Sequence, residues 1–436
     1  MSNVSKSSAE AVLPSFREAA WYWFRLGFLN FGGPSGQIAM MHEGLVERRR
    51  WVSEDRFLNA LNVCMLLPGP EAHQLAIYLG WLMHGARGGL VAGVCFVWPA
   101  AVLLGVLSWI YVQFGEVAAV HGVFEGLKPA VLAIVLAAVL RVGMKTLKTP
   151  LLMGVATFAW LSLTFLQVPF PVLRFGVMVL GWMVHRVRPV WLAAAPVDLA
   201  PKVSPINTNT HNVGWKGLAK ALFCGVLIWL GPLAVTALLL GGDHTLTKLG
   251  LFFSKAALVT FGGAYAVLPY VSQQAVEYYG WLTAPQMLAG LALAETTPGP
   301  LIIVLQFVGF LAGWQHPDGL PRGFSAVMGA ALTSWCTFVP SFIFIFLFAP
   351  FVERLRHWPG GQGALKAVTA AVVGVIFNLA VWFGLHVVWQ PGASVVDWVA
   401  LAITSGAFAA LWFFKVPMGW VILASAAMGL VQSFWR

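Results

Sequence analysis

The chain has 436 residues, of which 59% are hydrophobic and only 10% charged, and its mean hydropathy is +0.80. A soluble globular chain carries about 25% charged residues, so this composition excludes that class and indicates a polytopic membrane protein. The net charge of +10 would suit nucleic-acid binding, but the basic residues lie between apolar runs and form no single patch with interleaved aromatics. Membrane topology explains them more simply, so we expect no nucleic-acid partner.

The N-terminal segment and the cysteines indicate neither a cleaved signal nor a disulfide or metal site. The first fourteen residues are polar and lack the apolar core and cleavage site of a secretory signal, so we expect the N-terminus to be retained. The cysteines each stand alone inside an apolar run: Cys64, Cys95, Cys224 and Cys336. This spacing predicts neither a disulfide framework nor a metal site, and we interpret them as packing residues.

Nine apolar runs are long enough to cross a bilayer, which takes about 20 residues. They lie near residues 88–114, 126–146, 150–168, 170–187, 216–241, 324–349, 364–389, 396–414 and 417–435. Four further segments are apolar overall but are interrupted by Gly-Gly or Pro-Gly-Pro: 16–46, 57–84, 248–279 and 285–314. The sequence therefore predicts an all-α membrane protein in which broken helices accompany ordinary crossings.

The two halves of the chain repeat each other at an offset of 230 residues. The matching motifs are Phe31-Gly32-Gly33 with Phe261-Gly262-Gly263, and Pro68-Gly69-Pro70 with Pro298-Gly299-Pro300. Arg25 matches Lys255, so a positive charge stands six residues before each Phe-Gly-Gly. A repeated cation inside an apolar segment is hard to ascribe to chance.

A stretch rich in Pro, Asn and Thr separates the halves and indicates a solvated linker. We expect an N-terminal repeat over 1–187, a linker over 188–215, an unpaired crossing over 216–241 and a C-terminal repeat over 242–436. One unpaired crossing between repeats of even crossing number turns the second repeat upside down. The expected fold is therefore two inverted-topology repeats whose broken, re-entrant helices meet near the bilayer midplane.

The distribution of Lys and Arg favours this inversion, since basic residues concentrate in cytoplasmic loops. The loop at 47–56 begins with Glu and three arginines, whereas "EYYGW" at 277–281 has none. With a cytoplasmic N-terminus and re-entrant broken segments, the C-terminus lies outside, and four loops that fall outside contain no Lys or Arg. The alternative is thirteen full crossings, which would place the arginine-rich loop at 47–56 on the outer face of the membrane. We therefore favour the re-entrant arrangement.

The broken segments suggest a pathway for an anion. Unwound backbone at membrane depth is tolerated only where it is buried in protein or lines a cavity. Pro70 and Pro300 favour new helix starts after the breaks, and the Gly-Gly pairs at 32–33 and 262–263 permit close backbone approach. Helix N-termini would present free N–H groups and partial positive charge to an anion. A lone Pro-Gly-Pro is most simply a kink, but its repetition favours a site.

Side chains near the breaks complete the expected substrate site. Arg25 and Lys255 are costly in a membrane unless they pair or face water, so they are candidate counter-charges; snorkelling to the interface is the alternative. Neutral hydrogen-bond donors can hold an oxyanion without adding charge. The expected substrate-binding set is Arg25, Gly32, Gly33, Pro68, Gly69, Pro70, Gln74, Lys255, Gly262, Gly263, Thr296, Thr297, Pro298, Gly299 and Pro300.

Carboxylates beside an anion site repel the substrate unless they carry a proton, which suits them to proton coupling. Glu71 follows the first Pro-Gly-Pro and Glu295 precedes the second; a structural ion pair with Arg25 or Lys255 is the alternative for either. The expected coupling or gating set is His42, Glu43, Glu71, Gln273, Glu295 and Gln306, in which His42 and Glu43 could equally be surface residues. No phosphate loop, catalytic triad or metal motif is present, so we expect no cofactor and no ATP drive.

The segments 28–89, with "NFGGPSG" and "PGPEAH", and 260–313, with "TFGGAY" and "ETTPGP", resemble the two signature regions of the chromate ion transporter family. The likeness covers nearly the whole chain and is to the long, two-domain members. It implies chromate efflux across the bacterial inner membrane, driven by an ion gradient and conferring resistance, with sulfate as a competing look-alike. Transport of sulfate or another oxyanion is the alternative.

Composition and spacing alone indicate only an anion transporter with inverted repeats. A membrane-embedded enzyme is the rival class, but it would need a cofactor or metal constellation that the sequence does not display. We expect membrane lipid to surround the protein. The transporter could work as a single chain or as a homodimer.

The loops at 47–56 and 280–285 are predicted to lie on opposite faces of the membrane. Single cysteines placed in each loop, in a variant without the four native cysteines, should react with an impermeant thiol reagent from opposite sides. Permeabilised membranes, in which both positions should react, provide the control. Labelling of both loops from one side would refute the inversion.

Overall fold

The computed structural model describes residues 13–30, 33–65, 67–166, 168–188, 215–260, 264–349, 359–389 and 396–435. Within these ranges every regular element is helical, apart from one isolated β-bridge between Trp389 and Val396. The helices are α1 (Phe16–Leu29), α2 (Gly33–His42), α3 (Glu54–Cys64), α4 (Glu71–Phe114), α5 (Ala118–Thr146), α6 (Pro150–Thr164), α7 (Phe170–Val187), α8 (Trp215–Leu240), α9 (Thr245–Val259), α10 (Ala264–Gln273), α11 (Ala284–Thr296), α12 (Val304–Gln315), α13 (Arg322–Phe348), α15 (Pro359–Val387), α16 (Trp398–Trp412) and α17 (Met418–Trp435). The all-α prediction is confirmed.

Six of these helices are long and apolar enough to cross a bilayer: α4, α5, α7, α8, α13 and α15. The chain is therefore a multi-pass membrane protein. Helices α6 and α16, expected as full crossings over 150–168 and 396–414, have only 15 residues each. At 1.5 Å per residue each spans about 22 Å, less than the ~30 Å hydrocarbon core. They are shorter than predicted because each ends a few residues before a proline, Pro169 or Pro417, at which the chain turns.

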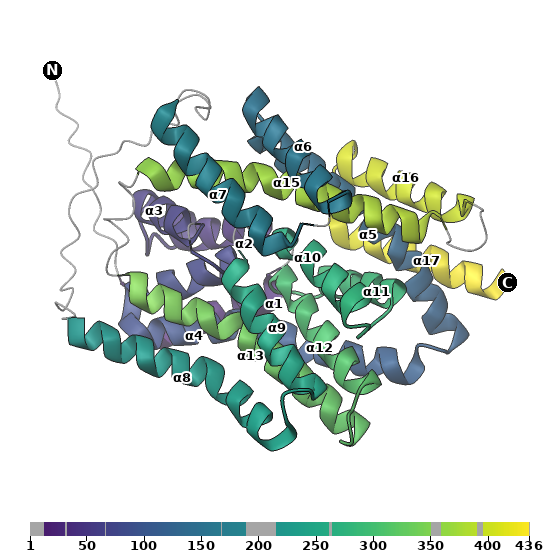
Figure 1. Cartoon of the computed structure of the whole chain (residues 1–436), viewed down its shortest axis with the longest axis horizontal. Helices are drawn as coiled ribbons and strands as arrows, with labels where there is room; N and C mark the ends of the chain where they lie inside the picture. Colours follow the sequence, from purple (N-terminus) through teal and green to yellow (C-terminus); the bar gives the residue numbers. More distant parts are fainter. Residues whose placement is uncertain are drawn as a thin grey trace.

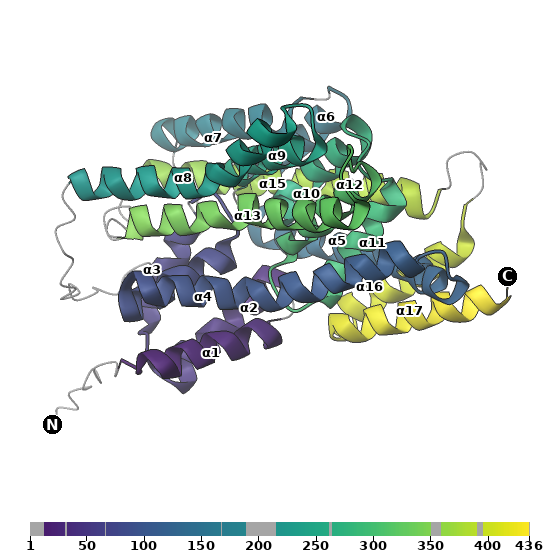
Figure 2. The ribbon, with the colours of Figure 1, turned by 90° about the horizontal axis from the view of Figure 1, so that it is seen from below.

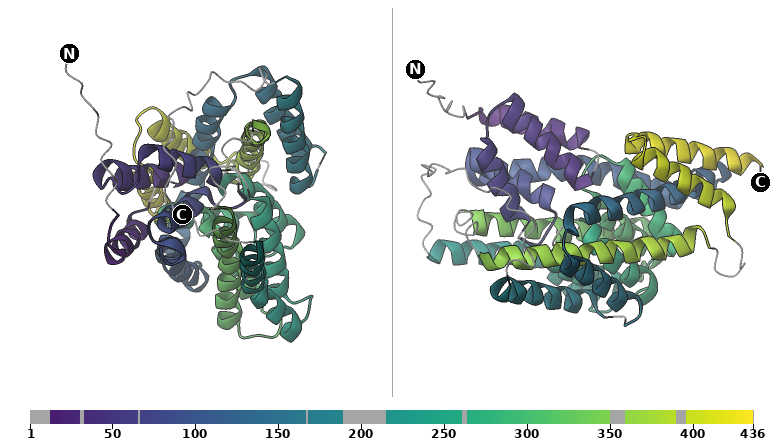
Figure 3. Two further views of the ribbon diagram at one scale, coloured as in Figure 1. Left: turned by 90° about the vertical axis from the view of Figure 1, so that its left-hand side faces the viewer. Right: turned by 90° about the horizontal axis from the view of Figure 1, so that it is seen from above.

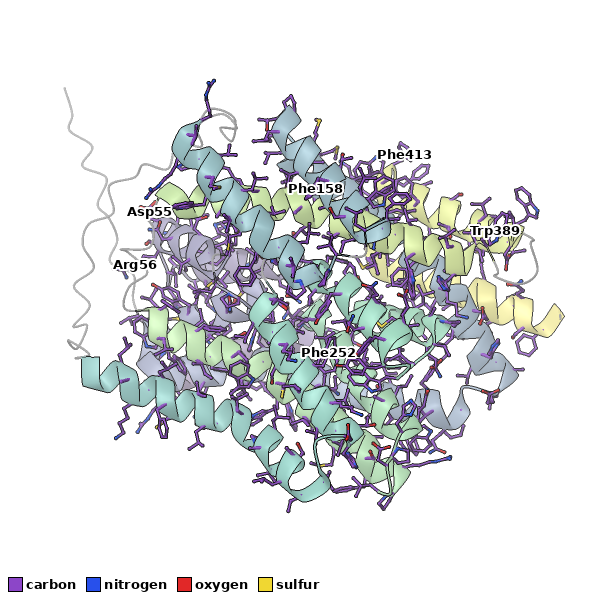
Figure 4. The ribbon with its side chains drawn as sticks, viewed as in Figure 1. Asp55, Arg56, Phe158, Phe252, Trp389 and Phe413 are labelled. Atoms are coloured by element: carbon purple, nitrogen blue, oxygen red, sulfur yellow. The ribbon has the colours of Figure 1, made fainter. Side chains whose placement is uncertain are left out.

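The long helices run side by side along the longest axis of the molecule (Figure 1, Figure 2). Helices α1 and α2 lie toward one end, and α16 and α17 toward the other (Figure 3). Asp55 and Arg56 of α3 lie near the first end and Trp389 near the second (Figure 4). Phe158 and Phe413 are exposed on the outside of the bundle. Such apolar outer faces fit a surrounding of lipid.

Each of the four interrupted segments is divided by a break into two helices: α1 and α2, α3 and α4, α9 and α10, and α11 and α12. All are short except α4, which runs on for 44 residues past a kink at His84 and Gly85. Pro70 immediately precedes the first residue of α4, with a φ of −71°. Pro300 precedes a 3₁₀ turn, η4 (Leu301–Ile303), with a φ of −67°. Proline suits these positions because its fixed φ is compatible with a helix start and it has no N–H to leave unpaired. The predicted breaks and helix starts are confirmed.

Equivalent positions of the two repeats take the same backbone conformation. The φ angles of Gly69 and Gly299 are 132° and 136°, and those of Arg50 and Gly280 are 55° and 61°. A π-helical turn follows α2 as η1 (Glu43–Arg48) and follows α10 as η3 (Gln274–Tyr278). The offset of 230 residues is thus a structural repeat as well as a sequence repeat.

The breaks of the two repeats hydrogen-bond to each other. The Gly69 amide donates to the Thr260 carbonyl at 2.6 Å, and the Gly299 amide donates to the Asn30 carbonyl at 2.8 Å. Because donors and acceptors are both related by the same offset, the contact is reciprocal, as a two-fold relation between the repeats requires. These bonds satisfy backbone groups that the breaks would otherwise leave unpaired inside the membrane.

The other helices interlock the repeats. Helix α5 of the first repeat packs against α16 and α17 of the second, while α15 of the second packs against α6 and α7 of the first. Helices α5 and α15 also pack against each other. Each repeat therefore packs helices against the other, and the breaks lie in the interior that the two repeats form together.

Gly69→Ala and Gly299→Ala are each expected to lower the free energy of unfolding by about 2–4 kcal/mol, through backbone strain plus overpacking. A Cβ on Gly299 would overlap the Cβ of Ala100, and one on Gly69 would lie 2.5 Å from Gln74 Nε2. Thermal unfolding of purified protein in detergent measures the loss. Gly176→Ala, on α7 with no atom within 4 Å of the added Cβ, is the control and should be nearly neutral. Wild-type stability of Gly299→Ala would contradict this packing.

Candidate functional site

A cavity of about 120 Å³ lies among α2, α4, α5, α10 and α15. Its polar lining residues are Ser35, Glu71, Arg141, Tyr265 and Thr369. A cavity of this size has room for several waters or one small oxyanion. The site is thus polar, small and assembled from both repeats.

Three helices begin at the wall of this cavity. Gly33 to Ser35 form the first turn of α2, Glu71 begins α4, and Tyr265 is the second residue of α10. The first N–H groups of a helix have no intrahelical acceptor and carry partial positive charge. Gly33 has a φ of 66°, so a glycine is favoured where the chain turns into α2.

Arg141, near the end of α5, is the only basic residue among the described lining residues. Its side chain is exposed, and none of the ion pairs in the described part of the chain includes it. A guanidinium offers five N–H donors in a planar fork that matches an oxyanion. The cavity therefore combines one free cation with three helix N-termini, an arrangement that attracts anions.

Two carboxylates flank the cavity. Glu71 lines it directly, in the first turn of α4, and forms no ion pair among the described residues. Glu295, at the end of α11, accepts a hydrogen bond of 2.7 Å from the Tyr265 hydroxyl. The alternative role, an ion pair of either carboxylate with Arg25 or Lys255, is not formed between these described residues. Glu295 is linked to the cavity through Tyr265.

Several buried polar groups beside the breaks lack partners. Asn30 is fully buried, and neither polar atom of its side chain is hydrogen-bonded within the described residues. Gln37 Nε2 donates to the Gly299 carbonyl at 2.5 Å, and Gln74 Nε2 donates to the Pro68 carbonyl at 2.6 Å, but both amide oxygens are unpaired. Buried polar groups are almost always satisfied, so these are places where water or a ligand would bind.

Arg25 and Lys255 lie outside the cavity. Both are exposed, Arg25 on α1 and Lys255 on α9, and neither is among the lining residues. The reason is helical phase: the faces of α1 and α9 that pack inward carry Trp23, Leu26 and Phe253, and the basic side chains fall on the opposite side. Their exposure agrees with the snorkelling alternative.

Some of the expected hydrogen-bond donors are already engaged. The hydroxyls of Thr296 and Thr297 both donate to the Leu293 carbonyl, as threonine at a helix end often does. Gln306 donates to the Ala101 carbonyl at 2.7 Å and accepts from Ser334 at 2.9 Å, so it ties α12 to α4 and α13. None of these three lines the cavity.

The remaining expected residues lie at the edges of the described region or far from the cavity. Gly33 lines it, whereas Gly32, Gly262 and Gly263 lie outside the described residues. His42 contacts Glu47 at 3.1 Å and Glu54 at 2.6 Å, and Glu43 pairs with Arg48, so both belong to a polar cluster at the end of α2. Gln273 lines a different cavity, at the far end of α10.

The sequence interpretation missed Arg141, Tyr265, Ser35 and Asn30. Arg141 stands at the end of an apolar run, so in the sequence it counts only among the Lys and Arg residues that the expected topology places on the cytoplasmic side. Ser35 and Tyr265 are equivalent in the repeat, and each is the second residue after a glycine pair, so the offset could have indicated them as a matched pair of hydroxyls. Nothing in the sequence singles out Thr369.

Fold and cavity together define a multi-pass membrane protein with an internal repeat and an anion-attracting interior. The sequence profile of the chromate transporter family matches residues 17–182 and 247–430. The chain therefore belongs to the chromate transporter family.

Three relatives align over almost their full lengths. A chromate transport protein of Cupriavidus metallidurans is 29% identical over 96% of this chain and 93% of its own. One of Pseudomonas aeruginosa is 31% identical, over 98% and 95%. A probable chromate transport protein of Synechococcus elongatus is 28% identical, over 97% and 96%. The agreement in length matches the expected long, two-domain form. No solved structure matches the chain.

Tyr265→Phe is expected to destabilise the protein by about 1–3 kcal/mol, because it leaves the Glu295 carboxyl without its hydrogen-bond donor. Tyr22→Phe is the matched control. The Tyr22 hydroxyl is buried without a partner, so its removal should be neutral or stabilising. Thermal unfolding in detergent compares the two; equal effects would show that the Tyr265 bond contributes nothing.

Proposed function

We propose that this protein is a secondary transporter that exports chromate across the bacterial inner membrane, driven by an ion gradient, and that it confers chromate resistance. The proposal rests on membership of the chromate transporter family and on chromate transport proteins as relatives. The observation that carries the mechanism is the convergence of three helix starts and Arg141 on one cavity. Sulfate, a dianion of the same shape, is the competing substrate.

The charge balance of the cavity supports a dianion. Each helix start contributes about half a positive charge, so three contribute about +1.5, and Arg141 raises the total to about +2.5. A dianion leaving water needs nearly full compensation, because burying uncompensated charge is very costly. The cavity offers this compensation without the basic side chains of Arg25 and Lys255.

Glu71 gives the same cavity a means of coupling anion binding to proton uptake. With Glu71 ionised, the positive total falls to about +1.5, which is less than a dianion requires. With Glu71 protonated, it returns to about +2.5, and the carboxyl can also donate a hydrogen bond to an oxyanion. Proton uptake by Glu71 would therefore accompany anion binding, and proton loss would favour release. Glu295, held by Tyr265, is the second carboxylate within reach of this process.

The expected topology fits this assignment. Arg141 belongs to the basic residues placed on the cytoplasmic side, so the cavity would open to the cytoplasm, where an exporter takes up its substrate. Helix α1 and the end of α17 lie at opposite ends of the long axis, as a cytoplasmic N-terminus and an external C-terminus require (Figure 2).

Transport itself is tested in proteoliposomes that contain the purified protein. An imposed proton gradient should drive radiolabelled chromate across the membrane, and excess sulfate should compete. Liposomes without protein and a gradient collapsed by an uncoupler are the controls. Absence of chromate and sulfate movement in every gradient tested would refute the transport proposal.

Arg141→Gln should weaken chromate binding about 10- to 100-fold, because hydrogen bonds to a charged group contribute about 1.5–3 kcal/mol. A binding titration in detergent measures the change, and the thermal midpoint verifies folding. Arg25→Ala and Lys255→Ala, which remove exposed cations outside the cavity, are the matched comparisons and should bind nearly as wild type. If these variants lose binding while Arg141→Gln retains it, the anion site lies on α1 and α9.

A further inference from the structure

A second cavity, of about 240 Å³, lies between α6, α10 and α15. Its floor includes Ser272, which is 2% exposed, and its mouth includes the exposed residues Gln273 and Glu277. The opposite wall is formed by Asn378 and Trp382 of α15. This cavity shares no lining residue with the first.

The two cavities lie along one seam, the line of contact between α10 and α15. Tyr265 lines the first cavity and Pro269 the second, four residues apart on α10; on α15, Ile376 lines the first and Leu379 the second. Residues three and four apart share a helix face and are separated by about 4.5–6 Å along the axis. Helix α10 packs against α15 along this seam. The cavities therefore stand in series, about one helical turn apart.

Buried apolar side chains lie along the seam between them. Leu268, Ile376 and Leu379 are each no more than 1% exposed. Pro269 follows directly within α10, where it removes an N–H and leaves the Tyr265 carbonyl without that helical partner. The π-helical turn η3 comes next. Proline and π turns are the usual places where a helix bends, so α10 can bend beside these apolar residues.

The second cavity differs from the first in its charge. Of its described lining residues only Glu277 is charged, and its carboxylate accepts a hydrogen bond of 2.9 Å from Trp382 Nε1. Ser272 Oγ is buried and has no hydrogen-bond partner among the described residues. Asn378 accepts from Thr164 at 2.8 Å through its amide oxygen, which leaves its NH₂ group available. The cavity thus offers neutral donors and one negative charge.

We propose that this second cavity is the release site of the transport pathway. It would be a low-affinity binding site for the oxyanion, located between the Arg141 cavity and the outside. The inference rests on the proposed oxyanion transport. Neutral donors from Ser272, Gln273 and Asn378 replace part of the hydration of the anion, and Glu277 keeps its affinity low by repulsion. A pathway conducts only when its sites bind weakly enough to let the substrate leave.

The test uses everted membrane vesicles, in which the cytoplasmic face is outside and uptake corresponds to export. Radiolabelled chromate uptake is measured with increasing unlabelled chromate preloaded in the lumen, which occupies the release side. In Glu277→Gln, the luminal concentration that halves uptake should fall about tenfold, because repulsion of the anion is removed. The KM for chromate on the cytoplasmic side should stay unchanged.

Glu47→Gln is the matched control. Glu47 is the repeat equivalent of Glu277 but lies beside His42, outside both cavities. It should leave luminal inhibition unchanged. In a background without native cysteines, Ser272→Cys and Asn378→Cys should react with an impermeant thiol reagent from the lumen, and chromate should slow the reaction.

The outcomes separate the two proposals. If wild-type vesicles take up no chromate, the proposed function fails, and the release site with it. If they take up chromate but Glu277→Gln shifts only the cytoplasmic KM or nothing, or chromate does not protect either cysteine, the release site is refuted while transport stands. A loss of gradient coupling in Glu277→Gln without any change in luminal inhibition would assign the cavity to the coupling cation instead.

Discussion

The structure depends on one constraint: broken backbone inside an apolar medium must find hydrogen-bond partners within the protein. Two reciprocal bonds, from Gly69 to Thr260 and from Gly299 to Asn30, meet this requirement by joining each Pro-Gly-Pro turn to the first break of the other repeat. Water cannot supply these bonds in lipid, so neither repeat can hold its breaks open alone. The position of the cavity follows, because three of the four helices that restart after the breaks, α2, α4 and α10, begin there.

The two repeats have similar backbone conformations but different side chains at equivalent positions. Equivalent turns have nearly the same φ, yet Glu71 corresponds to Leu301 and Ser35 corresponds to Tyr265. The polar cluster around His42 has no counterpart, since the equivalent Glu277 instead bonds Trp382. A symmetric scaffold therefore carries an asymmetric arrangement of charge: Arg141 and three helix starts accompany Glu71 at one cavity, whereas Glu277 is the only charged residue among the described lining residues of the other. In the proposed transport pathway, such a difference would give the two cavities different affinities for an anion.

Few charges lie near the interior, and each has a distinct setting. Arg141 lies at a cavity and takes part in no ion pair among the described residues, Glu295 accepts a hydrogen bond from a tyrosine, and Arg25 and Lys255 lie on exposed faces of α1 and α9. In a low-dielectric surrounding, helix dipoles and hydroxyl groups can do much of what full charges do, at a smaller desolvation penalty. This explains how a chain with so few charged residues can offer an anion a favourable environment.

The sequence alone determined the membrane class, the four breaks and the 230-residue repeat, because hydropathy, Pro-Gly-Pro and Gly-Gly act through local backbone chemistry. It also indicated Glu71, which adjoins a break. It did not determine which charges face inward: Arg25 and Lys255 were favoured for their repetition, yet helical phase against α4 and α13 turns them outward. Arg141 and Thr369 reach the cavity only because α5 and α15 pack beside the breaks, more than sixty residues along the chain from Glu71 and Tyr265 respectively. Tertiary packing decided the site, since the face that a helix presents depends on the neighbours it meets.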